Sequence, residues 1–267
     1  MAAIKSSNYK SRSVDKFGNA EYTKEENSVW HDLYERQVPI VKTRACPEYF
    51  NGVQLLDLNS QNIPQCTEVS KVLLDATGWQ LEPVPALIPF NKFFELLASR
   101  RFPAATFIRS REDMDYLKEP DIFHEVFGHC PLLTNQAYAD FTQTYGKLCL
   151  TTTPEDRAML AKLYWFTIEF GLVKSEAGPK VYGGGILSSK EETIYAVDSE
   201  IPQRKPFDVI DILRTPYRID ILQPVYFVID NLDVLFSLVD MDLLGAIKEA
   251  RALGMYEPLY DKEKSKE

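Results

Sequence analysis

The sequence is poor in residues that could cross-link or anchor it. Its 267 residues include four cysteines, Cys46, Cys66, Cys130 and Cys149, without a CxxC pair, which excludes a disulfide-rich scaffold and a zinc ribbon. No apolar run approaches the roughly 18 residues of a membrane helix. The first residues, MAAIKSSNYKSRS, lack the apolar stretch of a signal peptide. We therefore expect a cytoplasmic protein that does not bind a membrane.

Positive charge is also scarce. Lys and Arg number 30 against 39 Asp and Glu, which gives a net charge of −9, and the basic residues are spread along the chain. A protein that grips nucleic acid needs them concentrated, so we expect no nucleic-acid partner. Aromatic residues are abundant, with 14 Tyr, 15 Phe and 3 Trp. They suit an aromatic-lined pocket, although most large aromatic residues simply fill the core.

The pattern along the chain indicates one domain. No internal repeat and no Gly/Ser-rich linker divides it, and 45% apolar against 26% charged residues is ordinary for a globular protein with a sizeable core. We expect a loose polar arm over 1–20, a single domain over 21–260, and a solvated polar tail over 261–267.

Most of this domain is expected to be helical. Three prolines make 83–90 a rigid loop, after which Asn91 suits the N-cap of a helix. Apolar spacing and stop residues predict helices over 26–41, 65–77, 91–101, 119–131, 135–150, 154–173 and 231–253. The predicted strands are short, namely 102–110, a hairpin of 181–189 with 193–197, and 225–229. The fold class is therefore mostly α with a few short β-strands.

Two of the three histidines, His124 and His129, lie in the segment HEVFGH, whereas His31 stands alone and is expected to be an ordinary residue. Imidazole is the commonest metal ligand, so the pair predicts a metal site. Zinc peptidases space their histidines four apart. Here the interval is five, which separates the side chains by about 140° on an ideal helix. Gly128 and Pro131 would let the helix distort and end, so that His129 meets His124.

The third ligand should be an acid in an apolar setting, because a buried carboxylate is costly unless a cation compensates it. Glu169 is the only charged residue in LYWFTIEFGLV, residues 163–173; the alternative is an ion pair with a distant Lys or Arg. Two histidines and one carboxylate form the facial triad of non-haem Fe(II) oxygenases. Glu125 could face a bound cofactor or merely favour the start of its helix, and Cys130 is expected in the core.

Three motifs, EPDIFHEVFGHCPLL, YWFTIEFGL and YGGGILSS, occur in this order at matching intervals. In this the chain resembles the pterin-dependent aromatic amino-acid hydroxylases, and most closely the bacterial phenylalanine 4-hydroxylases. The likeness extends from about residue 21 to about residue 257. It implies the single-domain catalytic fold of that family and tetrahydrobiopterin or a related tetrahydropterin as reductant. The implied Fe(II) ligands are His124, His129 and Glu169.

The resemblance also implies roles around the metal. Arg109 would bind the substrate carboxylate through its planar fork, Asp121 would orient that arginine, and Ser188 would hydrogen-bond a ligand histidine. For each residue outside the triad, the alternative is a core aromatic or an ordinary ion pair. The implied substrate-binding residues are Arg109, Tyr116, Asp121, Trp165, Ser188 and Ile219. The implied pterin-binding residues are Leu87, Ile88, Phe93, on which the ring would stack, Glu125 and Tyr164.

The sequence departs from the animal enzymes of the family. Leu117 stands where they have a threonine that helps to hold the substrate carboxylate, and Ala86 replaces a glycine of the pterin loop. The chain has no room for their regulatory domain or tetramerisation helix, so we expect a monomer or homodimer. Tyrosine hydroxylases carry an aspartate at Ile219, and tryptophan hydroxylases tend to carry Phe at Trp165. Both differences favour phenylalanine as the substrate.

The implied reaction converts L-phenylalanine, O2 and a tetrahydropterin into L-tyrosine and a hydroxylated pterin, with no side chain needed as general acid or base. Two other functions remain open at this point. In a zinc or other metal hydrolase, Glu125 would activate a metal-bound water, but the five-residue interval disfavours it. A sensor would use the fold only to bind an aromatic amino acid, but the intact triad disfavours that.

Overall fold

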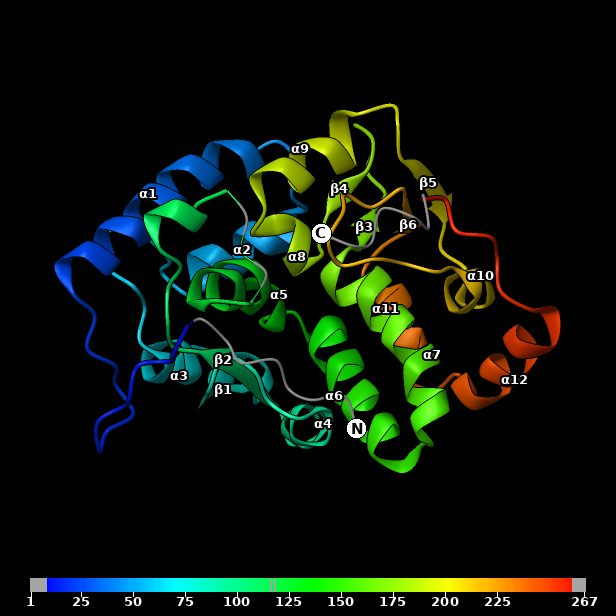
Figure 1. Ribbon diagram of the computed structural model, residues 1–267, viewed down its shortest axis with the longest axis horizontal. Helices are drawn as coiled ribbons and strands as arrows, with labels where there is room; N and C mark the ends of the chain where they lie inside the picture. The colour runs from blue at the N-terminus through cyan, green and yellow to red at the C-terminus, as the bar shows by residue number, and fades with distance from the viewer. Residues whose placement is uncertain (1–8, 116, 118, 261–267) are drawn as a thin grey trace.

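The computed structural model describes residues 9–115, 117 and 119–260. Helices surround two small sheets (Figure 1), so the expected mostly α class is confirmed. The first half contains α1 (Lys24–Val41), α2 (Pro47–Leu55), α3 (Cys66–Thr77), β1 (Gln80–Val84), α4 (Phe90–Ala98), β2 (Arg101–Ala105), the short η1 (Arg111–Asp113), η2 (Phe123–His129) and α5 (Cys130–Leu133). The second half contains α6 (Gln136–Thr151), α7 (Pro154–Tyr164), η3 (Trp165–Glu169), β3 (Leu172–Val173), β4 (Lys180–Val181), α8 (Gly184–Leu187), α9 (Lys190–Asp198), β5 (Gln203–Pro206), α10 (Val209–Arg214), β6 (Val225–Ile229), α11 (Asp233–Ser237) and α12 (Leu243–Leu253).

Several helices begin and end at the signals in the sequence. Thr23 caps α1 in a capping box with Glu26, because each side chain accepts a hydrogen bond from the other residue's backbone N–H. Pro154 occupies the first turn of α7. Gly78 ends α3 with a left-handed φ of 76°, as predicted. Local chemistry therefore fixes these boundaries.

The two sheets lie on either side of α5 and α8 in Figure 1. β1 and β2 form a parallel pair. The other sheet has the order β4-β3-β6-β5, in which β3 and β5 run parallel to β6 and β4 runs antiparallel to β3. The strand β2 leads directly towards Arg109, and β3 follows Glu169 after two residues. Both sheets therefore hold segments that the sequence analysis assigns to the site.

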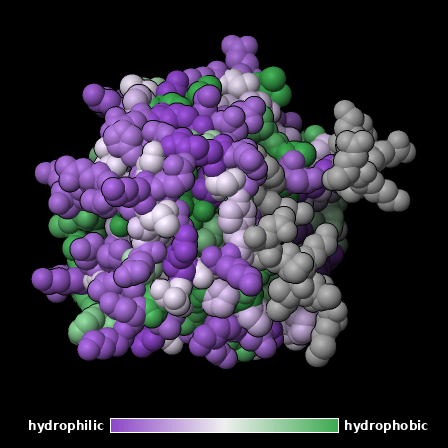
Figure 2. All heavy atoms as spheres, turned by 60° about the vertical axis from the view of Figure 1, so that its left-hand side comes forward, coloured by the Kyte–Doolittle hydropathy of each residue, from purple (hydrophilic) through white to green (hydrophobic). Residues whose placement is uncertain are grey.

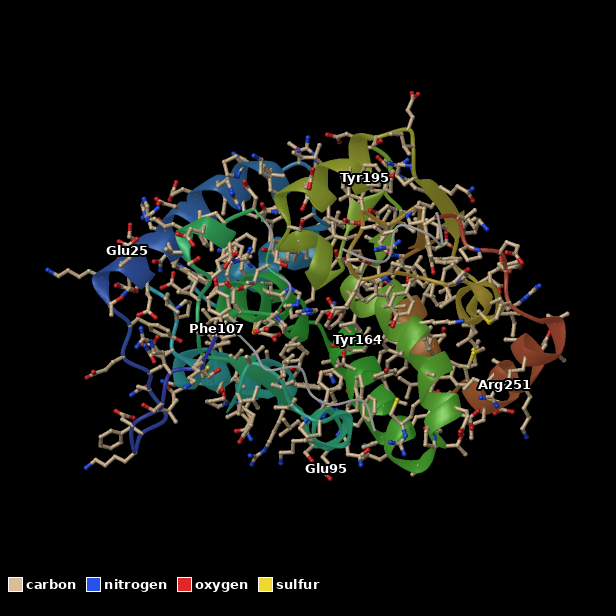
Figure 3. All side chains as sticks on the ribbon, viewed as in Figure 1. Glu25, Glu95, Phe107, Tyr164, Tyr195 and Arg251 are labelled. Carbon is tan, nitrogen blue, oxygen red and sulfur yellow. The ribbon has the colours of Figure 1, made fainter. Side chains whose placement is uncertain are left out.

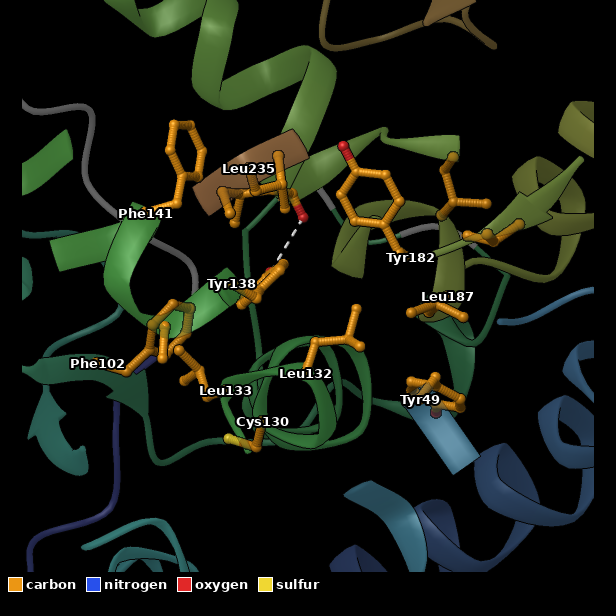
Figure 4. Packing of buried hydrophobic residues seen from close by; sticks show 14 of the residues in the cluster. Tyr49, Phe102, Cys130, Leu132, Leu133, Tyr138, Phe141, Tyr182, Leu187 and Leu235 are labelled. Atoms are coloured by element: carbon orange, nitrogen blue, oxygen red, sulfur yellow. Dashed lines mark hydrogen bonds between the residues drawn. The ribbon is translucent and has the colours of Figure 1, made fainter. Parts of the chain in front are cut away.

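The core is built mainly from aromatic and aliphatic side chains. Tyr138 of α6 is fully buried beside Leu132 and Leu133 of α5 (Figure 4). The dashed line in that figure is the hydrogen bond that its hydroxyl donates to the carbonyl of Ile168, 3.4 Å away. A tyrosine inside a core usually keeps such a partner, because its hydroxyl loses water on burial. This bond joins the core to the end of η3.

Three predicted helix boundaries are wrong. Pro89, not Asn91, is the N-cap of α4, and Asn91 instead accepts a hydrogen bond from Arg157. The helix predicted over 154–173 becomes η3 at Trp165 and then strand β3. The helix predicted over 231–253 is divided into α11 and α12, because Asp242 accepts from the N–H of Gly245 and starts a new helix.

The predicted hairpin of 181–189 with 193–197 is also wrong. Only Lys180–Val181 is a strand there, and α8 and α9 follow it. Ser189 caps α9 by accepting from the N–H of Glu192. The strand preference of the β-branched and aromatic residues in 181–197 is therefore outweighed here by a cap and by the packing of the glycines that precede it.

The described part of the polar arm contacts the rest of the chain. The Ser11 hydroxyl donates to the carbonyl of Val84 at 2.7 Å and accepts from the N–H of Thr106 at 3.0 Å. The ring of Tyr9 stacks on Phe107 at 4.8 Å. Residues 9–20 therefore include specific anchors.

The surface agrees with the acidic, polar composition. The face drawn in Figure 2 is mostly hydrophilic, with apolar side chains visible only in patches between polar ones. None of the helices within the described ranges is both long enough and apolar enough to span a bilayer.

Candidate active site

The segment HEVFGH forms a π-helix, η2, in which backbone hydrogen bonds join residues five apart. The N–H of Cys130, for example, bonds to the carbonyl of Glu125. Residues five apart lie near one another on such a turn, so the imidazoles of His124 and His129 face each other, with their Nε2 atoms 3.1 Å apart. The helix is distorted as predicted, but it does not fray at His129; it continues into α5 as far as Leu133. The larger circumference of the π-helix, and not fraying of a helix end, accommodates the five-residue interval between the histidines.

Glu169 also lies in a π-helix, η3. The N–H of Phe170 reaches back to the carbonyl of Trp165 at 2.8 Å. The Glu169 carboxylate comes within 3.4 Å of His129 Nε2 and 3.8 Å of His124 Nε2. The three residues therefore meet from two π-helical turns, a geometry found often at functional sites.

These three side chains fit a metal ion. One ligand atom from each lies within 4.8 Å of the others. Two ligand atoms at right angles, each about 2.1 Å from one ion, would be roughly 3 Å apart, close to the distance between the two imidazole nitrogens. Burial lowers the pKa of His124 to about 4, so its ring is neutral near pH 7 and can donate a lone pair.

Neighbouring groups set the orientation of the His124 ring. Its Nδ1 lies 2.9 Å from the Ser188 hydroxyl, which itself donates to the carbonyl of Gly184 at 2.9 Å. That hydroxyl can therefore only accept from His124, which places the proton on Nδ1 and leaves the Nε2 lone pair facing the other ligands. Ser188 thus contacts His124, one of the three candidate ligands.

His129 is held from two further directions. Its Nδ1 lies 3.5 Å from the hydroxyl of Tyr138, and its ring packs against Phe102 with centroids 5.2 Å apart. The backbone of Gly184 covers the ring so closely that a Cβ there would lie 2.4 Å from its atoms. His129 is consequently buried and fixed in orientation.

Arg109 and Asp121 form a buried bidentate ion pair. Arg109 donates from Nε and Nη2 to the two carboxylate oxygens at 2.8 and 2.9 Å. Asp121 also accepts from the backbone N–H of His124 at 3.0 Å. Burial alone would raise the pKa of Asp121, but the charge and hydrogen bonds of Arg109 hold it below its usual value. One carboxylate thus connects the arginine to the segment that carries two candidate ligands.

A cavity of about 400 Å³ joins this arginine to two of the three candidate ligands, His124 and Glu169. Both Arg109 and Glu169 line it. Ile219, 60% exposed, stands at its rim. Tyr116 lies outside the described residues. The other predicted site residues that line the cavity are His124, Trp165 and Ser188.

The residues assigned to the pterin lie in two groups. Phe93 meets Tyr164 edge-on at 5.7 Å, and Figure 3 places Tyr164 at the centre of the molecule. Burial, then the carboxylate of Glu169, raises the pKa of Tyr164, and the Glu125 carboxylate acts in the same direction. Leu87 and Ile88 lie on the more exposed loop before α4, and no hydrogen bond or ring contact joins them to the first group.

Comparison with known proteins settles the family. The sequence profile of the biopterin-dependent aromatic amino acid hydroxylases matches residues 1–239. This chain belongs to that family. Its members use biopterin, and the enzyme therefore combines a pterin requirement with the three-residue cluster described above.

Individual relatives agree over nearly the whole chain. The enzyme is 52% identical to the phenylalanine-4-hydroxylase of Pseudomonas aeruginosa, over 96% of this chain and 98% of that one. It superposes on the apo phenylalanine hydroxylase of Colwellia psychrerythraea with a TM-score of 0.92 and 52% identity, covering 94% and 97% of the two chains. The phenylalanine hydroxylase of Chromobacterium violaceum with bound Fe(III), 39% identical, gives a TM-score of 0.86 over 95% and 94%.

The sequence analysis missed residues of the enzyme that support the site. Gly184 and Gly185 pack against His129 and Glu169, and Gln223 bonds to Trp165. The signal for the glycines was the run of three in YGGGILSS, since adjacent glycines mark a close approach of backbone to another group. Cys130 is buried and bonds to the carbonyl of Glu125, as its expected core position requires.

Replacing Gly184 by alanine is expected to weaken iron binding by at least about tenfold, because the added methyl group would displace the ring of His129. Metal titration of the iron-free enzyme measures this. Ile186→Val alters the same helix without adding a contact and should bind iron normally. Unchanged iron affinity in Gly184→Ala would show that the ring is not held by this glycine.

Proposed function

We propose that this enzyme is a phenylalanine 4-monooxygenase, which converts L-phenylalanine, O2 and a tetrahydropterin into L-tyrosine and a hydroxylated pterin. One observation carries the proposal: His124, His129 and Glu169 form one cluster, and its members His124 and Glu169 line a cavity that the buried Arg109 also lines. The names of the similar proteins, phenylalanine-4-hydroxylases about half identical to this chain, support the substrate.

Arg109 is proposed to bind the substrate carboxylate. Its Nε and Nη2 are engaged by Asp121, and its Nη1 bonds to no residue in the described part of the chain. A guanidinium held rigidly on one side presents its remaining donors in a fixed direction, which favours a planar carboxylate. The aromatic ring of the substrate would then extend towards Trp165 and the metal ligands along the cavity.

Fe(II) is proposed to bind to His124, His129 and Glu169, and together with the reduced pterin it supplies the oxygen activation that side chains cannot. The protein contributes orientation. Ser188 fixes one imidazole and Tyr138 lies against the other. Three protein ligands leave positions on the ion open. No acid or base beyond these ligands is required.

The pterin is proposed to lie by Phe93 and Tyr164, with Glu125 beside it. Phe93 is half-buried and offers an aromatic face for stacking. Burial, then the carboxylates of Glu169 and Asp121, raise the pKa of Glu125 well above its usual value. Leu87 and Ile88, on the loop before α4, are proposed to close over the ring.

The decisive experiment is anaerobic reconstitution with Fe(II), followed by L-phenylalanine, tetrahydrobiopterin and O2. Stoichiometric tyrosine is the expected product. Hydrolysis by the Zn(II)-loaded protein without tyrosine would favour a metal hydrolase, and phenylalanine binding without any turnover would favour a sensor. Parallel reactions with tyrosine and tryptophan measure the substrate preference.

Glu125→Ala is expected to keep its iron and to raise the KM for tetrahydropterin by about tenfold, since a hydrogen bond to the cofactor would be lost. Steady-state kinetics with varied pterin, together with iron analysis, measure both effects. Glu125→Gln retains a polar side chain of the same size, so its KM for tetrahydropterin should lie between those of wild type and Glu125→Ala. If Glu125→Ala instead lost its iron, the residue would belong to the metal site.

The larger organisation is also a proposal. We propose an arm over 1–20, one catalytic domain over 21–260 and a polar tail over 261–267, in a cytoplasmic monomer or homodimer. Light scattering after gel filtration gives the oligomeric state. Limited proteolysis tests the domain bounds, and cell fractionation tests the location.

A further inference from the structure

Two residues that line the cavity, Trp165 and Phe170, belong to a stack of three aromatic rings. Trp165 lies between Phe170, at 4.3 Å and 28°, and Tyr217, at 4.6 Å and 21°. Stacking holds the separation of such rings, but it resists sliding and tilting only weakly. The position of Trp165 over the cavity must therefore be set by something else.

That constraint is a single buried amide. The indole N–H of Trp165 donates to Oε1 of Gln223 at 3.0 Å. The Nε2 of Gln223 donates to the carbonyls of Arg218 at 2.8 Å and Ile221 at 2.9 Å. Gln223 is 1% exposed, so these bonds face no competition from water. The amide thus connects the aromatic stack to the segment 218–222, which carries Ile219 at the cavity rim.

Gln223 is in turn fixed by an acid behind it. Glu192 of α9 accepts from the backbone N–H of Gln223 at 3.0 Å and from the hydroxyl of Tyr226 on β6, both through Oε1. In Figure 1, α9 lies alongside the four-stranded sheet that contains β6. Burial raises the pKa of Glu192 to about 7. Because one oxygen accepts both bonds, a neutral amide of the same shape can replace the acid.

We propose that Gln223 and Glu192 are positioning residues for the substrate: they set the place of Trp165 and the course of residues 218–222, and so hold the substrate ring against the metal. The inference rests on the proposed function. It predicts that removing one of these hydrogen bonds weakens phenylalanine binding and lowers the amount of tyrosine formed per pterin oxidised. The pterin and metal sites should be unaffected.

The main test uses Gln223→Leu, which keeps the volume and the backbone N–H but removes the amide. We expect the KM for phenylalanine to rise about tenfold, as for a lost buried hydrogen bond, and fewer tyrosines to form per pterin oxidised. The KM for tetrahydrobiopterin and the iron content should stay within about twofold of wild type. Equal rises in both KM values, or no rise in a folded variant, would overturn the proposal.

Glu192 supplies the matched pair and the second route if Gln223→Leu does not fold. Glu192→Gln preserves the acceptor and should resemble wild type, whereas Glu192→Leu should show the same defect as Gln223→Leu. Glu192 also lines the cavity, so it could affect the substrate directly, and the double variant distinguishes the two routes. If Glu192 acts through Gln223, adding Glu192→Leu to Gln223→Leu changes the KM for phenylalanine little. Additive effects, or a Glu192→Gln variant as defective as Glu192→Leu, would contradict this role.

A spectroscopic readout separates positioning from general damage. Trp30 and Trp79 are fully buried elsewhere, so the near-ultraviolet circular dichroism lost in Trp165→Phe defines the signal of the stack. Gln223→Leu should lose that signal, and Glu192→Gln should keep it. A wild-type protein that forms no tyrosine would sink the proposed function. A wild-type protein that forms tyrosine, with a Gln223→Leu variant unchanged in spectrum and kinetics, would sink only the present inference.

Discussion

Glu169→Ala is expected to bind no iron after anaerobic reconstitution and to form tyrosine more than about a hundredfold more slowly than wild type, since even indirect supports of a metal ligand contribute 10- to 100-fold. The carboxylate is the only acid in the cluster with the two imidazoles. Burial alone would raise the pKa of Glu169, but the neighbouring His129 and His124 lower it by more. The net result is a pKa below the usual value, so the carboxylate is ionised near pH 7. Iron per chain and tyrosine per minute are the two measurements.

Thermal unfolding distinguishes a lost ligand from a damaged fold. Iron binds the native state and so should raise the melting temperature of wild type, whereas Glu169→Ala should melt at the same temperature with and without iron. Glu125→Ala serves as the matched control, because it removes a neighbouring buried acid and should still respond to iron. Full iron occupancy in Glu169→Ala would mean that the ligand assignment is wrong.

The second large effect is expected from Asp121→Ala. The change leaves the Arg109 guanidinium buried without its partner and removes the acceptor of the His124 N–H. Removing one partner of a buried ion pair destabilises a protein by about 3–5 kcal/mol. We expect a loss of this size in denaturant unfolding, together with a rise of more than about tenfold in the KM for phenylalanine.

A double variant shows which part of that loss comes from the unpaired charge. Arg109→Met with Asp121→Leu replaces the pair by apolar side chains of similar size, which is often nearly neutral for stability. It should therefore recover much of the stability but none of the affinity for phenylalanine. A double variant as unstable as Asp121→Ala would assign the stabilising role of Asp121 to the start of η2 instead.

The sequence was sufficient to bring the candidate ligands together, but not to predict how they meet. Two histidines five apart and an isolated acid in an apolar segment can be read directly from the local sequence. The π-helical turns cannot be read from it, because they depend on contacts with distant segments. At Gly128 a Cβ would lie 2.6 Å from the carbonyl of Gly184, a contact made across more than fifty residues. Spacing on an ideal α-helix could not reveal it.

The wrong hairpin has a similar cause. VYGGGILSS and TIYAV contain β-branched and aromatic residues, which are typical of strands, and the glycines between them carry no helical signal. In the folded chain those glycines form a helix because Gly184 covers His129 and Ser188 bonds to His124. Gln223 was missed for a related reason, since a single glutamine before a strand has no pattern. Its importance comes only from the burial that its three partners create.

Both π-helical turns that carry the candidate ligands are wider than the α-helices they adjoin, α5 and α7, so function and stability favour different backbone geometries in these turns. A π turn holds one residue more than an α turn needs for the same advance, so loss of a single residue from either segment would give a more regular helix. The imidazole or carboxylate beyond that point would then rotate away from its partners. Within these two segments, random change that improves the helix should be selected against, and length, more than residue identity, should be the property that resists alteration.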